Sequence, residues 1–142
     1  MSHENVEIAR RVYAASASLL RKAAAGEDIS EAPELVELFD PDVVIVEVVE
    51  YPDASIYRGR DQMRRWLMGW LDAYDGISIE PQDFVAVGDH VMIDTRQRFR
   101  SKVGIELEQD ITQVMRFRDG RMIHATGYRD RSNALKAVGL AE

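Results

Sequence analysis

The spacing of apolar residues first changes close to Pro41, and this change limits the possible folds more than any other feature. Before it, residues 6–25 carry apolar side chains at the spacing of a helix, and residues 33–39 form a shorter helical segment. After it, residues 43–49 are almost continuously apolar and β-branched, which is typical of a strand covered on both faces. The sequence therefore predicts helices first and strands after them, the order of an α+β protein.

A third helix is predicted beyond this first strand, because its apolar residues repeat at the i, i+3, i+4, i+7 spacing of one helical face. These residues are Met63, Trp66, Leu67, Trp70, Leu71 and Tyr74. Turn signals then divide most of the remaining chain into strands over residues 77–87, 91–100, 105–118 and 122–129. A short last helix is predicted over residues 132–138. We expect the strands to form an antiparallel meander that curves around the helices and encloses one internal pocket.

The register of the middle hairpin follows from its charges, because residues directly opposite each other on antiparallel strands interact. The register with unlike charges opposed joins Arg100 to Glu106, Arg98 to Glu108 and Arg96 to Asp110. The other face of the two strands is then the predicted core face, and it carries Val91, Ile93, Thr95, Phe99, Ile105, Leu107, Ile111, Met115 and Phe117. Three glutamines, Gln97, Gln109 and Gln113, share that face and need partners or a ligand there.

The next hairpin permits two registers. A two-residue turn at Asp119-Gly120 would direct inward His124, Thr126 and Tyr128. A three-residue loop with Gly120 in the left-handed conformation would instead direct inward Ile123, Ala125 and Gly127. We prefer the second register, because it repeats the loop at residues 102–104, pairs Thr112 with Thr126 on the outside and leaves room for a cavity.

Composition limits the kind of protein and its partners. With 142 residues, of which 46% are hydrophobic and 30% charged, residues 1–142 are expected to form one domain with its own core. The net charge of -7 disfavours a phosphate-binding surface, so no nucleic acid partner is expected. The sequence has no cysteine, and its three histidines lack ligand spacing, so we expect neither a metal nor a cofactor. No segment reads as a secretory signal or a membrane span, which makes a cytoplasmic protein without a membrane partner the default expectation.

Several stretches, taken in order, resemble one family. They are residues 5–13, 38–44 (LFDPDVV), 57–60 (YRGR), 114–121 (VMRFRDGR) and 128–135 (YRDRSNAL). Over essentially its whole length the chain resembles the SnoaL-like polyketide cyclase family, within the superfamily of nuclear transport factor 2 (NTF2) and ketosteroid isomerase. The resemblance implies a cone-shaped α+β barrel, in which N-terminal helices cover a curved antiparallel sheet, and a homodimer.

The resemblance also suggests three catalytic positions. Ketosteroid isomerase combines an aspartate general base with an oxyanion hole made by a tyrosine and a protonated aspartate. The matching positions in this sequence are Glu47, Tyr13 and Gln113. Glu47 and Gln113 also stand out without the resemblance, as polar residues on otherwise apolar strand faces. Both depart from the aspartates of the isomerase, and the amide of Gln113 donates a hydrogen bond but cannot lend a proton.

The remaining candidate residues would line the pocket and contact a ligand: Trp66, Trp70, Phe84, Phe99, Ile111, Met115, Ala125 and Arg129. The resemblance favours a cofactor-free isomerase, cyclase or hydrolase that acts on a small, mainly apolar molecule of steroid or polyketide type. Two alternatives remain open, a non-catalytic ligand-binding or accessory dimer and an interaction module that uses the outer face of the sheet. Structural roles are also open, with Glu47 paired to Arg58 or Arg129 and the aromatic rings serving only as core.

Overall fold

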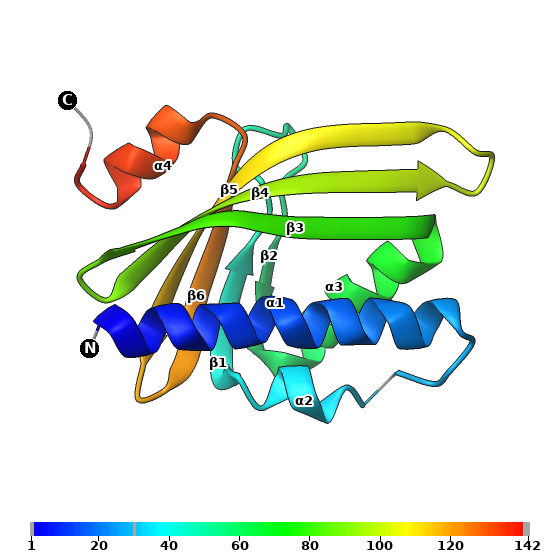
Figure 1. The fold of residues 1–142 in the computed structure, drawn as a ribbon, viewed down its shortest axis with the longest axis horizontal. Coiled ribbons are helices and arrows are strands. Elements are labelled where there is room, and N and C mark those ends of the chain that lie inside the picture. Colours follow the sequence, from blue (N-terminus) through cyan, green and yellow to red (C-terminus); the bar gives the residue numbers. More distant parts are fainter. Residues whose placement is uncertain (1, 30, 141–142) are drawn as a thin grey trace.

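A computed structural model describes residues 2–29 and 31–140, and this part of the chain folds into four helices and a six-stranded sheet (Figure 1). The helices are α1 (Ser2–Ala24), α2 (Pro33–Val36), α3 (Gly59–Ala73) and α4 (Arg131–Ala137). The strands are β1 (Phe39–Val46), β2 (Ile56–Arg58), β3 (Tyr74–Val87), β4 (His90–Ser101), β5 (Glu106–Arg118) and β6 (Arg121–Tyr128). The α+β prediction is therefore confirmed.

Two element predictions differ from the structure around β1. The second helix is shorter than predicted, because the chain turns extended at Phe39 and enters β1 four residues before the predicted start. β2 was not predicted at all, since three residues after a loop are too few to establish a period of two. It pairs antiparallel with β1, opposite Val44–Val46, and leads directly into α3.

The strands follow the order β2-β1-β6-β5-β4-β3 in a curved sheet that does not close into a barrel. All neighbouring strands are antiparallel except β1 and β6, which are parallel, so the expectation of a wholly antiparallel sheet is wrong at this pair. α1 packs mainly on β3 and β4, and α3 packs mainly on β1, while α4 contacts β5 and β6 (Figure 1).

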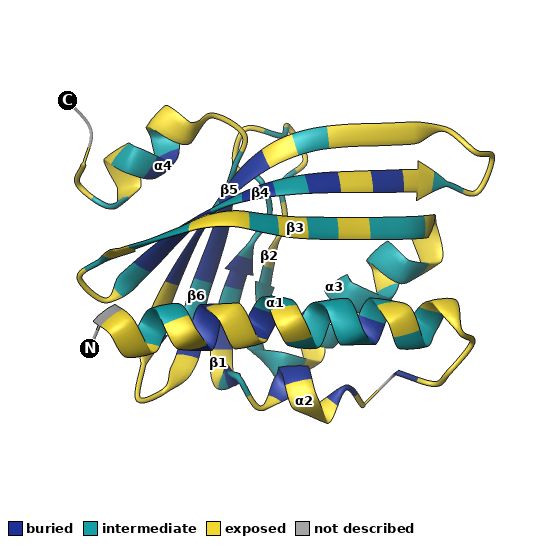
Figure 2. Ribbon diagram, in the orientation of Figure 1, coloured by how far each residue is buried: buried dark blue, intermediate teal, exposed yellow. Residues whose placement is uncertain are grey.

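The two faces of the sheet belong to different apolar clusters. The face that α1 and α3 cover, called the inner face, contributes Ile93, Met115 and Ala125 to the main core. The opposite, outer face contributes Met92 and Val114 to a smaller cluster that Ala134 of α4 completes. Figure 2 shows the resulting mixture of buried and exposed bands along the strands.

The predicted register of the β4–β5 hairpin is confirmed, with Arg100 opposite Glu106, Arg98 opposite Glu108 and Arg96 opposite Asp110. The predicted core face is wrong at the end of this hairpin. Ile105 and Leu107 are 59% and 52% exposed, because α1 and α3 pack on β1, β3 and β4 and leave this end of β5 uncovered.

The β5–β6 hairpin combines features of both predicted registers. Its turn has two residues, Asp119 and Gly120, with φ values of 53° and 78°, which identifies a type I′ turn and excludes the preferred three-residue loop. A register shift beside Phe117 then adds one residue to β6 at Ile123. The two-residue turn directs Met122 inward in place of Ile123, and the bulge then returns Ala125 and Gly127 to the inner face. Thr112 consequently pairs with Tyr128 and not with Thr126, which faces Val114.

Candidate functional site

A chain of aromatic rings follows the side of α3 that faces the sheet. The ring centroids of Trp66 and Trp70 lie 6.2 Å apart, and Trp66 is also 6.2 Å from Tyr57 of β2. Trp70 lies 4.9 Å from Phe99 of β4, and Tyr74 lies 5.8 Å from Trp70 and 5.1 Å from Phe99. These rings form a continuous apolar wall suited to a flat molecule. Tyr57 and Tyr74 belong to it, although only the two tryptophans and Phe99 were predicted.

Tyr13 projects from the middle of α1 toward β3. Its ring meets that of Phe84 edge to face at 6.0 Å, and the guanidinium of Arg10 lies 4.4 Å from the centre of the same Phe84 ring. The Tyr13 hydroxyl is buried and has no hydrogen-bond partner within the described residues. Burial raises the pKa of Tyr13 far above its ordinary value. Tyr13 is therefore an uncharged phenol whose hydrogen is available to an acceptor.

Trp66 supplies a second buried donor of this kind. Its indole Nε1 is inaccessible and makes no hydrogen bond to any residue that the structure describes. An indole nitrogen can only donate, so a neighbouring donor would not satisfy it. A buried donor without a partner costs about 1–3 kcal/mol, and such groups are rare in folded proteins. No described residue therefore places an acceptor within reach of the Tyr13 hydroxyl or the Trp66 indole N–H.

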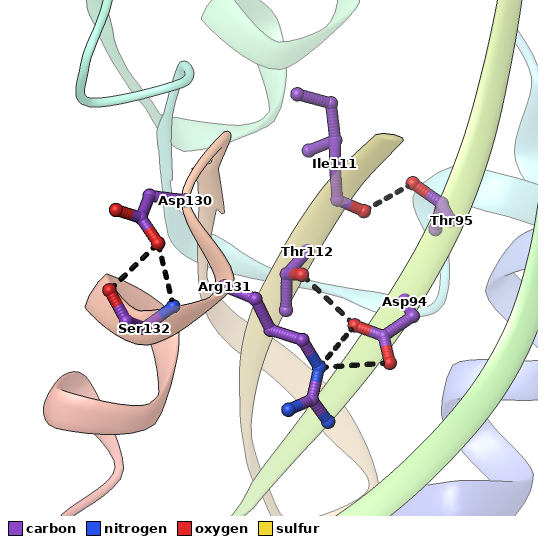
Figure 3. A network of polar contacts seen from close by, with 7 residues as sticks. All are labelled: Asp94, Thr95, Ile111, Thr112, Asp130, Arg131 and Ser132. Carbon is purple, nitrogen blue, oxygen red and sulfur yellow. Dashed lines mark hydrogen bonds and ion pairs between the residues drawn. The ribbon is translucent and has the colours of Figure 1, made fainter. Parts of the chain in front are cut away.

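A line of hydrogen bonds between uncharged side chains crosses the inner face of β4 and β5. The hydroxyl of Tyr51 donates to Oε1 of Gln109, and Nε2 of Gln109 donates to Oε1 of Gln97 over 3.2 Å. Nε2 of Gln97 donates to the hydroxyl of Thr95 over 3.2 Å, and Thr95 donates to the backbone oxygen of Ile111 over 2.7 Å. Figure 3 shows this last bond. Gln97 is only 6% exposed, so the line satisfies polar groups that burial would otherwise penalise.

Gln113 lies at the other end of the inner face, opposite Gly127, and Glu47 lies just beyond the end of β1. Gln113 is opposite Gly127, and a Cβ on this glycine would meet Nε2 of Gln113 at 3.2 Å and the Val48 side chain at 3.1 Å. Gln113 makes no side-chain hydrogen bond within residues 2–29 and 31–140. Glu47 follows the last residue of β1, and its Oε1 accepts a 3.1 Å hydrogen bond from the backbone N–H of Ser55. Val48, and not Glu47, therefore fills the space over Gly127, while the half-buried Glu47 side chain is held toward the segment that enters β2.

The other predicted ligand-binding residues differ in burial. Ile111, Met115 and Ala125 are buried on the inner face, and Phe84 is half-buried beside Tyr13. Arg129 is exposed, lies just beyond the end of β6, and uses its backbone N–H to bind Glu50.

Two hollows lie at the two ends of α1. The one at the C-terminal end has a volume of about 600 Å³ and is lined by residues that include Leu20, Met68, Tyr74 and Arg100. The one at the N-terminal end, of about 540 Å³, is lined by residues that include Ile8 and Phe117. None of the predicted site residues lines either hollow. The predicted internal pocket therefore remains a proposal that rests on the inner-face side chains.

Neither a membrane helix nor a metal cluster is found in the described part of the chain. Over those residues, no helix is long and apolar enough to cross a membrane. The same residues contain no group of three or more His, Cys, Asp or Glu side chains that could hold a metal ion.

Sequence reasoning missed Tyr51 as part of this site. Its partner Gln109 is 58 residues away in the chain, and a tyrosine in a loop beside Pro52 gives no periodic signal. The two glutamines of the line were recognisable, because the charge-based register placed both on an apolar face. A search for a donor to complete that pair is the one signal that would have led to Tyr51.

The curved mixed sheet with helices on its inner face is the arrangement of NTF2-like proteins. The model of the SnoaL-like domain family matches residues 20–125, and the chain belongs to this family. No protein of curated function matches the chain.

Solved structures agree with this assignment. An NTF2-like protein of unknown function from Burkholderia pseudomallei is similar with a TM-score of 0.72 and 16% identity, over 96% of this chain and 98% of that one. TerC, co-crystallised with polyporic acid, gives a TM-score of 0.69 and 18% identity over 95% and 98% of the two chains. A candidate SnoaL-like polyketide cyclase from Jannaschia sp. gives a TM-score of 0.69 and 13% identity over 99% and 95%. At these identities the similarity establishes the fold.

Proposed function

We propose that the protein binds a small, mainly apolar molecule of steroid or polyketide type between the inner face of the sheet and helices α1 and α3. Three buried side-chain donors have no partner in the described part of the chain, the Tyr13 hydroxyl, the Trp66 indole N–H and Nε of Arg64, and the first two carry this proposal. A ligand oxygen in reach of either donor would form the hydrogen bond that the protein itself does not supply. The amide of Gln113 on β5 is a further donor on this side of the sheet.

Two further observations support a ligand of this class. The aromatic wall of α3 offers ring faces to an apolar body, which is the usual lining of a small-molecule site. TerC, which has the same fold, was crystallised with polyporic acid, and the Jannaschia protein carries the name of a polyketide cyclase. The family expectation of a homodimer and of one domain over residues 1–142 remains part of the proposal.

Proton-transfer catalysis is the second candidate function, and the carboxylate oxygen of Glu47 that has no partner among the described residues supports it. Ser55 anchors Oε1 of Glu47, while Oε2 has no hydrogen-bond partner among the residues that the structure describes. In a cofactor-free isomerisation, cyclisation or hydrolysis, Oε2 would take a proton from the substrate or from water. Tyr13 and Gln113 would donate hydrogen bonds to the oxygen on which negative charge develops.

The binding proposal is tested with a matched pair of probes, α-tetralone and tetralin, which differ by one ketone oxygen. Quenching of tryptophan fluorescence should show tighter binding of the ketone. Tyr13→Phe should weaken ketone binding about fivefold, the effect of one neutral hydrogen bond, and leave tetralin unchanged. Tyr128→Phe, on the outer face, serves as the matched control and should change neither affinity. Equal affinities of both probes for the parent protein would contradict the proposal.

The catalytic candidate is tested separately with Glu47→Gln, which keeps the size of the side chain and removes its basicity. Turnover of an identified substrate should disappear while the affinity for α-tetralone is preserved. Undiminished turnover would exclude Glu47 as the base and leave the binding function intact.

A further inference from the structure

Tyr51 places a phenol ring at the inner face from the loop between β1 and β2. The loop follows β1 and precedes β2, and within it the Tyr51 N–H donates to Val48 O over 3.0 Å. The Tyr51 side chain is half-buried, and its hydroxyl donates to Oε1 of Gln109. An aromatic hydroxyl supplied by the protein thus occupies the first position of the hydrogen-bond line.

The direction of this line defines what its first position accepts. Gln109 uses Nε2 to donate to Gln97, Gln97 donates to Thr95, and Thr95 donates to a backbone oxygen. Because each bond points the same way, Oε1 of Gln109 is left as an acceptor at the open end of the line. A group that replaces Tyr51 must therefore bring a hydrogen, as an O–H or N–H does.

The surroundings of Gln109 suit a ring beside that hydroxyl. Gln97 and Gln109 are opposite each other, and the next inward pair along the two strands is Phe99 and Leu107. Phe99 lies 4.9 Å from Trp70 of the aromatic wall, and Leu107 is 52% exposed. This position, called the Gln109 subsite, is therefore apolar on its inner side and open toward solvent on the other. Its charged neighbours on β4 and β5, such as Arg98 and Glu108, face outward.

The Tyr51 backbone is fixed independently of its side chain. The carboxylate of Glu50, the preceding residue, accepts hydrogen bonds from the backbone N–H groups of Arg129 and Asp130 over 2.8 and 3.0 Å. It also accepts one from Nδ2 of Asn133 over 2.9 Å. These bonds hold the loop against the start of α4, so rotation of the Tyr51 side chain alone would vacate the subsite.

We propose that the Gln109 subsite binds an aromatic hydroxyl group of the ligand, and that Tyr51 occupies it in the free protein as a chemical stand-in. A phenolic ligand displaces the Tyr51 ring, donates its own hydroxyl hydrogen to Oε1 of Gln109, and leaves the rest of the line unchanged. This inference rests on the proposed binding function and narrows its ligand class to molecules with a phenolic end.

The test compares β-naphthol with its methyl ether, which has the same rings and no hydrogen to donate. Removal of the competing side chain in Tyr51→Ala should raise the affinity for β-naphthol about fivefold, the equivalent of one neutral hydrogen bond. Tyr51→Phe, which keeps the ring and loses the hydroxyl, should raise it less. In Tyr51→Ala, β-naphthol should bind more tightly than the ether, and adding Gln109→Leu should remove that preference. Tyr128→Phe is the control and should behave as the parent does.

An unchanged or lower affinity of Tyr51→Ala for β-naphthol would overturn the inference, and so would equal binding of the ether. Either result would leave the binding function standing if α-tetralone still distinguishes the parent from Tyr13→Phe. Failure of all four probes to bind any folded variant, as judged by cooperative thermal unfolding, would overturn both proposals.

Discussion

Polar residues on the two faces of β4 and β5 differ in their bonding partners, and the adjacent residues Asp94 and Thr95 show the contrast (Figure 3). On the outer face, Asp94 binds the Thr112 hydroxyl at 2.9 Å and the Arg131 guanidinium at 3.2 Å, which ties α4 to the sheet. On the inner face, Thr95 ends a line of uncharged groups, and the two donors of Tyr13 and Trp66 that lie on this side of the sheet have no partner.

The contrast distinguishes the polar groups that stabilise the fold from those that we propose bind a ligand. Outer-face charges form ion pairs such as Arg96 with Glu108 and Arg116 with Asp89, so the fold itself accounts for them. The inner face combines neutral amides and hydroxyls with aromatic rings. Such a surface suits a neutral, mainly apolar ligand, because an ionic one would lose its hydration without gaining a counter-charge.

The largest expected effect comes from truncating the adjacent residues Met92 and Ile93, which face opposite sides of the sheet. Ile93→Ala should lower the free energy of unfolding by about 3–4 kcal/mol, because it leaves a cavity in the main core. Met92→Ala should cost less, about 2 kcal/mol, because the outer cluster is small and α4 can close on the gap. Urea unfolding measures both. A larger loss for Met92→Ala would mean that α4 and the outer face dominate the stability of the fold.

A smaller effect is expected from Asp94→Ala on the outer face. The substitution removes the acceptor of Thr112 and the partner of Arg131, and it should destabilise the protein by about 1–2 kcal/mol. Arg131→Ala should cost less, since that guanidinium is half exposed. If the double variant loses the sum of the two single effects, Asp94 and Arg131 do not interact and the outer network is not what holds α4.

Tyr13→Phe should change the free energy of unfolding in the opposite direction. Because the Tyr13 hydroxyl is buried without a partner, its removal should leave the free energy of unfolding unchanged or raise it by up to about 1 kcal/mol. The same variant should bind α-tetralone more weakly, which separates a binding role from a structural one. A clear loss of stability in the urea titration would show that the hydroxyl is satisfied and would remove the contrast between the faces.

The smallest effect concerns His124 on the outer face. Burial, and then the nearby charges of Arg116, His90 and Arg58, lower the pKa of His124 below its ordinary value. The unfolded chain therefore binds this proton at higher pH than the folded chain does. Stability should therefore fall slightly as the pH drops from neutral through the ordinary histidine pKa. His124→Gln should flatten that slope in unfolding measured at neutral and mildly acidic pH, and an unchanged slope would assign it to other groups.

Much of the fold could be predicted from the sequence because local patterns determined it. The opposed charges of Arg96, Arg98 and Arg100 fixed the register of one hairpin correctly. The next hairpin was only partly predictable, because its turn has two residues in place of the preferred three, and the bulge at Ile123 then returns Ala125 and Gly127 to their predicted inward positions. The site was less predictable. No local pattern shows that Tyr51 reaches Gln109, or that Tyr13 and Trp66 lack partners in the described part of the chain, because both depend on contacts between distant segments.

The central claim is that a buried donor between the sheet and its helices has no partner within the described residues until a ligand supplies an acceptor, and this can be measured directly at Trp66. The sequence contains two tryptophans, so a proton–nitrogen correlation spectrum shows two indole signals, and Trp66→Phe identifies one of them. We predict that the Trp66 indole proton resonates upfield, as a proton without a hydrogen bond does. It should move downfield when α-tetralone is added and stay in place with tetralin. A Trp66 signal already at a hydrogen-bonded position in the free protein, or one that the bound ketone does not move, would contradict the account.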